Sequence, residues 1–278
     1  MIRNQKNIIS FIKEDCSYPL LQRRVFMSQN GHFVWYDLMS KDPKASEEFY
    51  TKVVGWSYQD FPMPDFTYRM IAHGENQLGG IVPLGEGDDI PSHWISYLNV
   101  PDVDETVKKA EELGGKSCVP PTDIPDVGRF AVVNDPQGGF FSPFTPKNEM
   151  KIPEGLGTVA WRELITSDPA KAKDFYTKLV GWEPEDMEVG PEKYVMFKVG
   201  EKSVAGMVNK PIPEGEKARP YWIPYFTVAD VDTACKTAEE NRGQVQFEPT
   251  DIPDIGRFAI LMDPQGATFA VYSPPNEN

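Results

Sequence analysis

An internal repeat constrains the fold of this chain more than any other feature of its sequence. The nine residues TDIPDVGRF at 122–130 return as TDIPDIGRF at 250–258, with eight of nine positions identical. Three further matches keep the same order: FYTK at 49–52 and 175–178, GW at 55–56 and 181–182, and DPQG at 135–138 and 263–266. The copies lie 126 residues apart early in the repeat and 128 apart late in it. Collinear matches of this kind indicate two copies of one domain.

The repeat sets the expected domain boundaries. We expect one domain at 31–147, a linker at 148–156 and a second domain at 157–276. Residues 1–30 have no counterpart in the second half, and their short apolar run is too interrupted for a signal peptide. Two interpretations stay open for this N-terminal extension. It is either disordered, with Met27 as the natural start, or a short amphipathic helix that packs on the body.

Each copy contains two helix patterns. Asp42 and Pro43 precede apolar residues at helical spacing, and Gly55 follows them. This order predicts a helix with an aspartate N-cap, proline in the first turn and glycine at the end. Residues 102–114 predict a second helix, and 168–181 and 230–243 predict the copies of both.

Strand patterns surround the helix patterns. In the first half they cover 33–39, 68–72, 78–83, 94–100, 130–134 and 140–144, and we expect a short strand after each helix. The order is strand, helix and three strands, four times over. This predicts an α+β fold built from four βαβββ modules. Asp123 and Asp251 are expected in turns.

Composition excludes several classes of function. A net charge of −14 repels phosphate backbones, which argues against nucleic-acid binding. No apolar run reaches the about 18 residues that a membrane span needs. The three cysteines are scattered, which fits a reducing compartment, and we expect a cytoplasmic protein.

The order of these motifs resembles the vicinal oxygen chelate superfamily, which contains glyoxalases, bleomycin-resistance proteins and dioxygenases. The resemblance rests on residues 49–56, 102–104 and 128–138, and on their copies in the second half. It is closest to the tandem glyoxalase-like proteins often labelled hydroxylases. It implies that modules pair into cup-shaped mixed sheets of eight strands, two cups in this chain. Whether modules pair within a half or across halves stays open, as does monomer or homodimer.

The resemblance also implies a divalent metal in each cup, but this chain departs from the family at the ligand positions. The positions expected to carry His, Gln or Glu hold the following residues: Trp35, Gly80, Ile95 and Ser142 in the first half, and Trp161, Gly206, Ile223 and Ala270 in the second. These residues are poor metal ligands. We therefore predict no cofactor. A divalent metal held by displaced ligands, with His93 as one of them, is the alternative.

Two carboxylates remain as candidate catalytic residues. Strand alternation places Trp35 with Asp37, and Trp161 with Glu163, on one face. If that face looks into the cup, each carboxylate lies in an apolar wall and has the raised pKa of a general base. The alternative is structural: Asp37 pairs with Arg129, and Glu163 with Arg257, to brace the sheet.

Two functional hypotheses follow. The first is a protein that binds a small apolar or aromatic molecule in a metal-free cup, with no nucleic-acid or membrane partner. The second is an enzyme, either a lyase, isomerase or hydroxylase that uses Asp37 or Glu163 as base, or a divalent-metal lactoylglutathione lyase or dioxygenase. The expected ligand contacts are Trp35, Ile95, Arg129, Ser142, Trp161, Ile223, Arg257 and Ala270. We expect Trp94 and Trp222 to pack under the helices instead.

Overall fold

The computed structural model describes residues 29–63, 66–85, 87, 90–189, 192–209 and 220–275. The expectation for the N-terminal extension therefore falls outside the described residues, apart from 29 and 30. No helix in the described part of the chain combines the length and apolar character that a membrane crossing requires.

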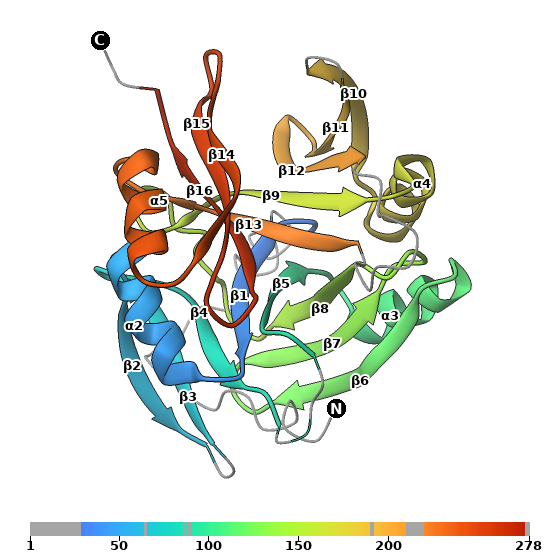
Figure 1. Ribbon diagram of the computed structural model, residues 1–278. Coiled ribbons are helices and arrows are strands. Elements are labelled where there is room, and N and C mark those ends of the chain that lie inside the picture. The colour runs from blue at the N-terminus through green and yellow to red at the C-terminus, as the bar shows by residue number, and fades with distance from the viewer. Residues whose placement is uncertain are drawn as a thin grey trace.

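The first half forms one mixed sheet with two helices (Figure 1). Its elements are β1 (Phe33–Ser40), α2 (Pro43–Val53), β2 (Ser57–Pro62), β3 (Thr67–His73), β4 (Asn76–Pro83), β5 (His93–Asn99), α3 (Val103–Glu112), β6 (Lys116–Ile124), β7 (Gly128–Asn134) and β8 (Phe140–Pro146). The strand order is β2-β3-β4-β1-β5-β8-β7-β6. β1 runs parallel to β4 and antiparallel to β5, and β5 runs parallel to β8.

The second half repeats this architecture. Its elements are β9 (Val159–Thr166), α4 (Pro169–Val180), β10 (Glu183–Val189), β11 (Glu192–Val199), β12 (Lys202–Asn209), β13 (Tyr221–Thr227), α5 (Val231–Glu240), β14 (Gln244–Ile252), β15 (Gly256–Met262) and β16 (Thr268–Ser273). The strand order is β10-β11-β12-β9-β13-β16-β15-β14. Each sheet takes strands from one half only, so modules pair within a half. The predicted α+β fold with two cup-shaped sheets is confirmed.

The four helices of the described residues begin as the sequence predicts. Asp42, Asp102, Asp168 and Asp230 are the N-caps, and each side chain accepts a hydrogen bond from a backbone N–H in the first turn. The distances are 2.7–3.1 Å. These carboxylates satisfy donors that have no partner within the helix.

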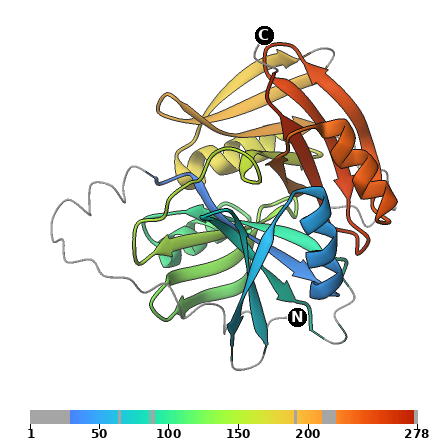
Figure 2. The same cartoon turned by 90° about the vertical axis from the view of Figure 1, so that its left-hand side faces the viewer.

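The two halves pack through their helix-bearing faces. α2 lies beside α5, α3 lies beside α4, and the central strands β5 and β13 of the two sheets contact each other between these two helix pairs (Figures 1 and 2). One continuous hydrophobic cluster, the interface core, contains buried side chains from both halves. Trp94 and Trp222 belong to it, as alternation predicts. Burial on this scale makes the halves one packed unit.

Tryptophan and tyrosine side chains join the halves by hydrogen bonds inside the interface core. Trp56 Nε1 donates to the Gly157 carbonyl at 2.7 Å, and Trp182 Nε1 donates to the Gly31 carbonyl at 2.8 Å. Tyr50 also donates to Asp263 at 3.2 Å. Each first strand is therefore anchored at its start by an indole from the other half.

The expectation that Asp123 and Asp251 occupy turns is wrong. They lie in β6 and β14, opposite Arg129 and Arg257. The hairpin bends later, where Asp126 and its copy Asp254 have positive φ of 64° and 63°. Aspartate tolerates the left-handed region better than most residues.

Candidate ligand-binding cups

The first cup is the concave face of the sheet from β2 to β8, and the second cup is the concave face of the sheet from β10 to β16. Trp35, Ile95 and Phe144 form a buried cluster on the first of these faces, separate from the interface core. Ile223, Tyr225 and Ala270 form a smaller cluster on the second, with Trp161 packed against it. Both indoles thus point into the cups, on the same face as Asp37 and Glu163, as alternation along β1 and β9 together with the family resemblance predicts.

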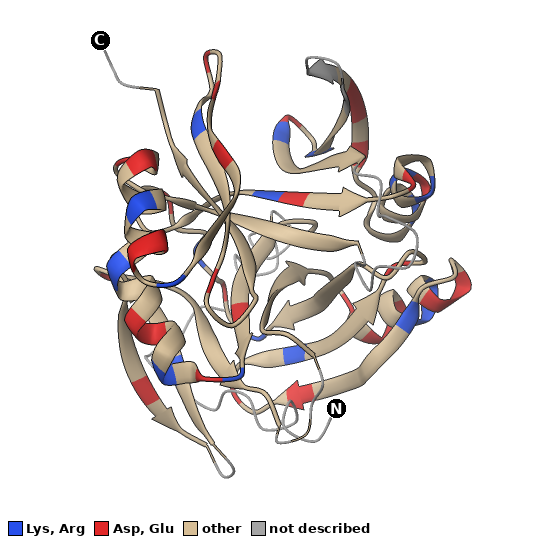
Figure 3. Ribbon diagram, viewed as in Figure 1, with Lys and Arg blue, Asp and Glu red and all other residues tan. Residues whose placement is uncertain are grey.

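One charged residue lies on the central strands of the first sheet. Asp37 is the only Asp, Glu, Lys or Arg in β1, β4, β5 and β8, all of which are described throughout (Figure 3). Its exposed fraction is 0%. A carboxylate at such a position requires hydrogen-bond donors.

Two tyrosines supply these donors. Tyr68 Oη donates to Asp37 Oδ1 at 2.8 Å, and Tyr97 Oη donates to Oδ2 at 2.8 Å. Trp35 Nε1 donates in turn to Tyr68 Oη at 2.9 Å. Burial raises the pKa of Asp37 to about 6, although the tyrosine hydroxyls and the Gly80 amide favour its charged form. Burial also holds both tyrosine pKa values well above their ordinary range, so both remain donors.

The second cup carries the same arrangement with a longer carboxylate. Tyr225 Oη donates to Glu163 Oε1 at 2.9 Å, and Trp161 Nε1 donates to Tyr194 Oη at 2.8 Å. Tyr194 also hydrogen-bonds Glu163, and burial is the main cause of its raised pKa. Unlike Asp37, Glu163 and Trp161 are partly exposed.

Glycine makes room for these tyrosines. A Cβ at Gly80 would lie 2.0 Å from the Tyr68 ring, and a Cβ at Gly206 would lie 1.6 Å from Tyr194 Oη. The family resemblance predicted a metal ligand near both glycines. No sequence pattern predicted these tyrosines as site residues, although the repeat offsets align Tyr68 with Tyr194 and Tyr97 with Tyr225.

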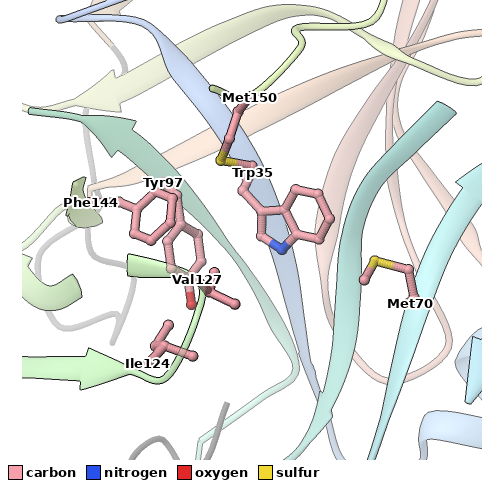
Figure 4. A pocket seen from close by; sticks show the side chains of 7 residues that line it. All are labelled: Trp35, Met70, Tyr97, Ile124, Val127, Phe144 and Met150. Carbon is pink, nitrogen blue, oxygen red and sulfur yellow. The ribbon is translucent and has the colours of Figure 1, made fainter. Parts of the chain in front are cut away.

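The first cup is almost filled. Its remaining cavity has a volume of about 20 Å³, which accommodates about one water molecule. Figure 4 shows the side chains around it. They are Trp35, Met70, Tyr97, Ile124, Val127, Phe144 and Met150, the last of which comes from the linker. No small organic molecule fits this space as it stands.

The rims of the two cups differ. Phe247, Ile255 and Met187 of the second half are exposed to 45%, 53% and 38%. The repeat aligns them with Val119, Val127 and Phe61. Val119 is buried to 3% exposure, and the other two are partly buried against the first cup's cluster. Apolar positions that are covered in the first cup are thus uncovered in the second.

The expected ion pairs with the cup carboxylates are wrong. Arg129 contacts Asp104 at 2.6 Å and Asp123 at 2.8 Å, and Arg257 contacts Asp232 at 2.8 Å and Asp251 at 2.9 Å. Arg129 alternates with Phe130, which lies on the concave face, so it points to the helix side. Neither arginine lines a cup. Each ties the first turn of a helix to a strand.

The remaining predicted contacts lie on the concave faces but are buried. Ile95 pairs with Asp37 across β1 and β5, and Ile223 pairs with Glu163 across β9 and β13. Ser142 has no exposed surface and donates its hydroxyl to the Ala131 carbonyl at 2.7 Å. Ala270 is also fully buried.

The donors present do not fit the divalent metal that the resemblance implies. In the described ranges, no three His, Cys, Asp or Glu side chains come together as a metal site. The carboxylate oxygens of Asp37 and Glu163 already accept hydrogen bonds from tyrosines. His93 hydrogen-bonds the Pro91 carbonyl at 3.0 Å instead, and burial lowers its pKa.

Comparison with known proteins agrees with this architecture. Residues 31–141 and 155–271 match the family described as Glyoxalase/Bleomycin resistance protein/Dioxygenase superfamily. "Putative glyoxylase CFP32" of Mycobacterium tuberculosis is 36% identical over 247 residues, which cover 86% of this chain and 94% of that protein. "Anthracycline biosynthesis protein DnrV" of Streptomyces peucetius is 33% identical over 258 residues, covering 87% and 92%.

Solved structures show the same fold. The 2,3-dioxygenase LapB from Pseudomonas sp. KL28 superposes with a TM-score of 0.61 at 13% identity, covering 90% of this chain and 95% of that one. The Mn(II)-bound glyoxalase from Novosphingobium aromaticivorans gives a TM-score of 0.61 at 15% identity, covering 88% and 82%.

Proposed function

Because the chain belongs to the glyoxalase/bleomycin resistance/dioxygenase superfamily, we propose that it binds a small, flat, apolar molecule in its second cup without a metal. Glu163 is the polar anchor of this ligand. The observation that carries the proposal is the difference between the rims. The tyrosine–carboxylate arrangement occurs in both cups. Phe247, Ile255 and Met187 of the second half are exposed, whereas the aligned residues of the first half are buried or partly buried.

The walls of the second cup favour a flat ligand. The Tyr225 and Phe258 rings lie 5.9 Å apart, and Phe258 stacks on Phe247 with centroids 5.4 Å apart and an interplanar angle of 16°. Aromatic side chains thus extend from Glu163 toward the exposed rim. Such walls suit planar aromatic molecules, whose faces pack against ring faces and edges.

The base of the cup selects for a hydrogen-bond donor. Tyr225 and Tyr194 both direct their donors to the Glu163 carboxylate. A carboxylate accepts at about four lone-pair sites, so a ligand O–H or N–H adds to this network without displacing a tyrosine. A hydroxylated aromatic molecule matches both the walls and the base. The name of DnrV, an anthracycline biosynthesis protein, supports a planar polycyclic ligand.

The same geometry supports a second candidate function, proton transfer. Glu163 is partly exposed, and the tyrosines beside it are kept neutral because burial and the Glu163 charge raise their pKa values. A ligand held against this carboxylate would place an acidic C–H or O–H within its reach. Turnover distinguishes the enzyme from the binding protein.

Calorimetric titration with 2-naphthol, a planar molecule with one hydroxyl, tests the proposal on protein treated with a chelator. We expect one equivalent to bind. Glu163→Gln removes a charged acceptor and should weaken binding about tenfold or more. Glu248→Gln removes an exposed charge from the same sheet and is the matched control. Binding that requires added Mn²⁺ or Zn²⁺, or that Asp37→Asn weakens and Glu163→Gln does not, would overturn the proposal.

A further inference from the structure

The segment that joins the two halves lies over the first cup. Met150 lines the remaining cavity beside Trp35 (Figure 4). Ile152 packs against the same concave cluster. Between and around them, Glu149, Lys151 and Glu154 are exposed. The segment therefore directs its apolar side chains inward and its charged side chains to solvent, as a cover does.

Side chains alone hold this segment in place. Among the described residues, the backbone of 148–154 makes no hydrogen bond. The flanking bonds are Lys147 N–H to the Val127 carbonyl at 2.7 Å, and Thr158 N–H to the Gly155 carbonyl at 3.2 Å. Lifting the segment thus breaks no backbone hydrogen bond and exposes only a few apolar side chains. Segments held in this way open at low free-energy cost.

Beneath the segment, the first cup has the features of a ligand site. Its walls are apolar and aromatic, and Asp37 with its tyrosine donors lies at the base. Only about 20 Å³ remains empty. Met150 lines this cavity and Ile152 packs against the same cluster, and methionine adapts well to such irregular space.

We propose that Met150 and Ile152 are a built-in occupant of the first cup, which holds a second, latent site for the same ligand class. The wild-type chain then binds one ligand, in the second cup, and removing the two side chains opens the first. The ligand class rests on the proposed function. The existence of the covered site rests on the contacts of the linker.

Stoichiometry tests this inference. Calorimetry with 2-naphthol should give one equivalent for the wild type and two for the Met150→Gly/Ile152→Gly variant. Glu149→Gly/Lys151→Gly adds two glycines at exposed positions of the same segment and should still bind one equivalent. Adding Glu163→Gln to the double variant should weaken one of its two sites and leave the other unchanged.

The outcomes separate this inference from the proposed function. A folded double variant that still binds one Glu163-dependent equivalent, or a wild type that binds two, overturns the latent site. A wild type that binds none, with a double variant that binds one, overturns the proposed function and supports the latent site. If the glycine variant does not fold, Met150→Ala/Ile152→Ala replaces it. Hydrogen exchange of the amides of 149–152 should also be fast in the wild type, and strong protection would overturn the low cost of opening.

Discussion

Tyr97 donates its hydroxyl to Oδ2 of Asp37 over 2.8 Å, and every partner that the structure gives this buried carboxylate is a neutral donor. Neutral donors stabilise the charge less than a cation would, and burial dominates. Burial therefore raises the pKa of Asp37 from its ordinary 3.8 to about 6.

This raised pKa predicts a pH dependence of stability. The folded chain holds the Asp37 proton more tightly than the unfolded chain does. The contribution of Asp37 to the free energy of unfolding is thus most favourable below about pH 4 and falls as pH rises through about 6, by about 3 kcal/mol. Asp37→Asn removes this loss, so its free energy of unfolding relative to wild type should rise by about 3 kcal/mol between pH 4 and pH 7.5. Urea unfolding measures it, and a difference that stays constant with pH would contradict the assignment.

Replacing Gly80 should disrupt the same network. A Cβ at this position would lie 2.0 Å from the Tyr68 ring, and overpacking of this kind costs about 1–3 kcal/mol. We expect Gly80→Ala to lower the urea midpoint, and Gly80→Ala/Tyr68→Leu to lose less than the sum of its single variants. Strict additivity of the two substitutions would show that Gly80 does not act by making room for Tyr68.

The indole hydrogen bonds between the halves should contribute equally. Trp56→Phe leaves the Gly157 carbonyl without its 2.7 Å donor, and Trp182→Phe does the same to Gly31 at 2.8 Å. A buried group left unsatisfied costs about 1–3 kcal/mol. Both variants should lose this much in urea unfolding while keeping one cooperative transition. Separate transitions of the two halves would contradict the view that they are one packed unit.

The arginines should not affect ligand binding. Arg257 lies on the helix side of its sheet and is partly exposed, with ion pairs to Asp232 and Asp251. Such pairs contribute about 0–1 kcal/mol to stability. Arg257→Ala should therefore leave 2-naphthol affinity unchanged and lower stability only slightly. A tenfold loss of affinity would show that Arg257 contacts the ligand and would contradict its placement on the helix side.

The repeat and the strand alternation predicted most of the fold. They located the βαβββ modules, the four aspartate N-caps and the pairing of Trp35 with Asp37 and of Trp161 with Glu163 on one face; that this face is the concave one came from the family resemblance. These features depend on local spacing, which a sequence displays directly. How modules pair depends on contacts between distant strands, and the sequence left that question open.

The sites were predicted less completely, for physical reasons that differ between residues. Alternation places Arg129 and Phe130 on opposite faces of the sheet, but it does not say which of the two residues lies on the concave face. The tyrosine donors lie on β3 and β5, so their convergence on Asp37 depends on strand register. The cover provided by Met150 comes from a segment without regular structure, for which no periodicity exists.

The packing of the two halves through their helix-bearing faces has a consequence for each half taken alone. An isolated half would present its side of the interface core, with its tryptophans and phenylalanines, to water. The surface that would bury these side chains best is the helix-bearing face of a second half with the same architecture. A severed half would therefore tend to associate with itself and rebuild, as a pair of chains, the twofold arrangement that the duplication contains within one.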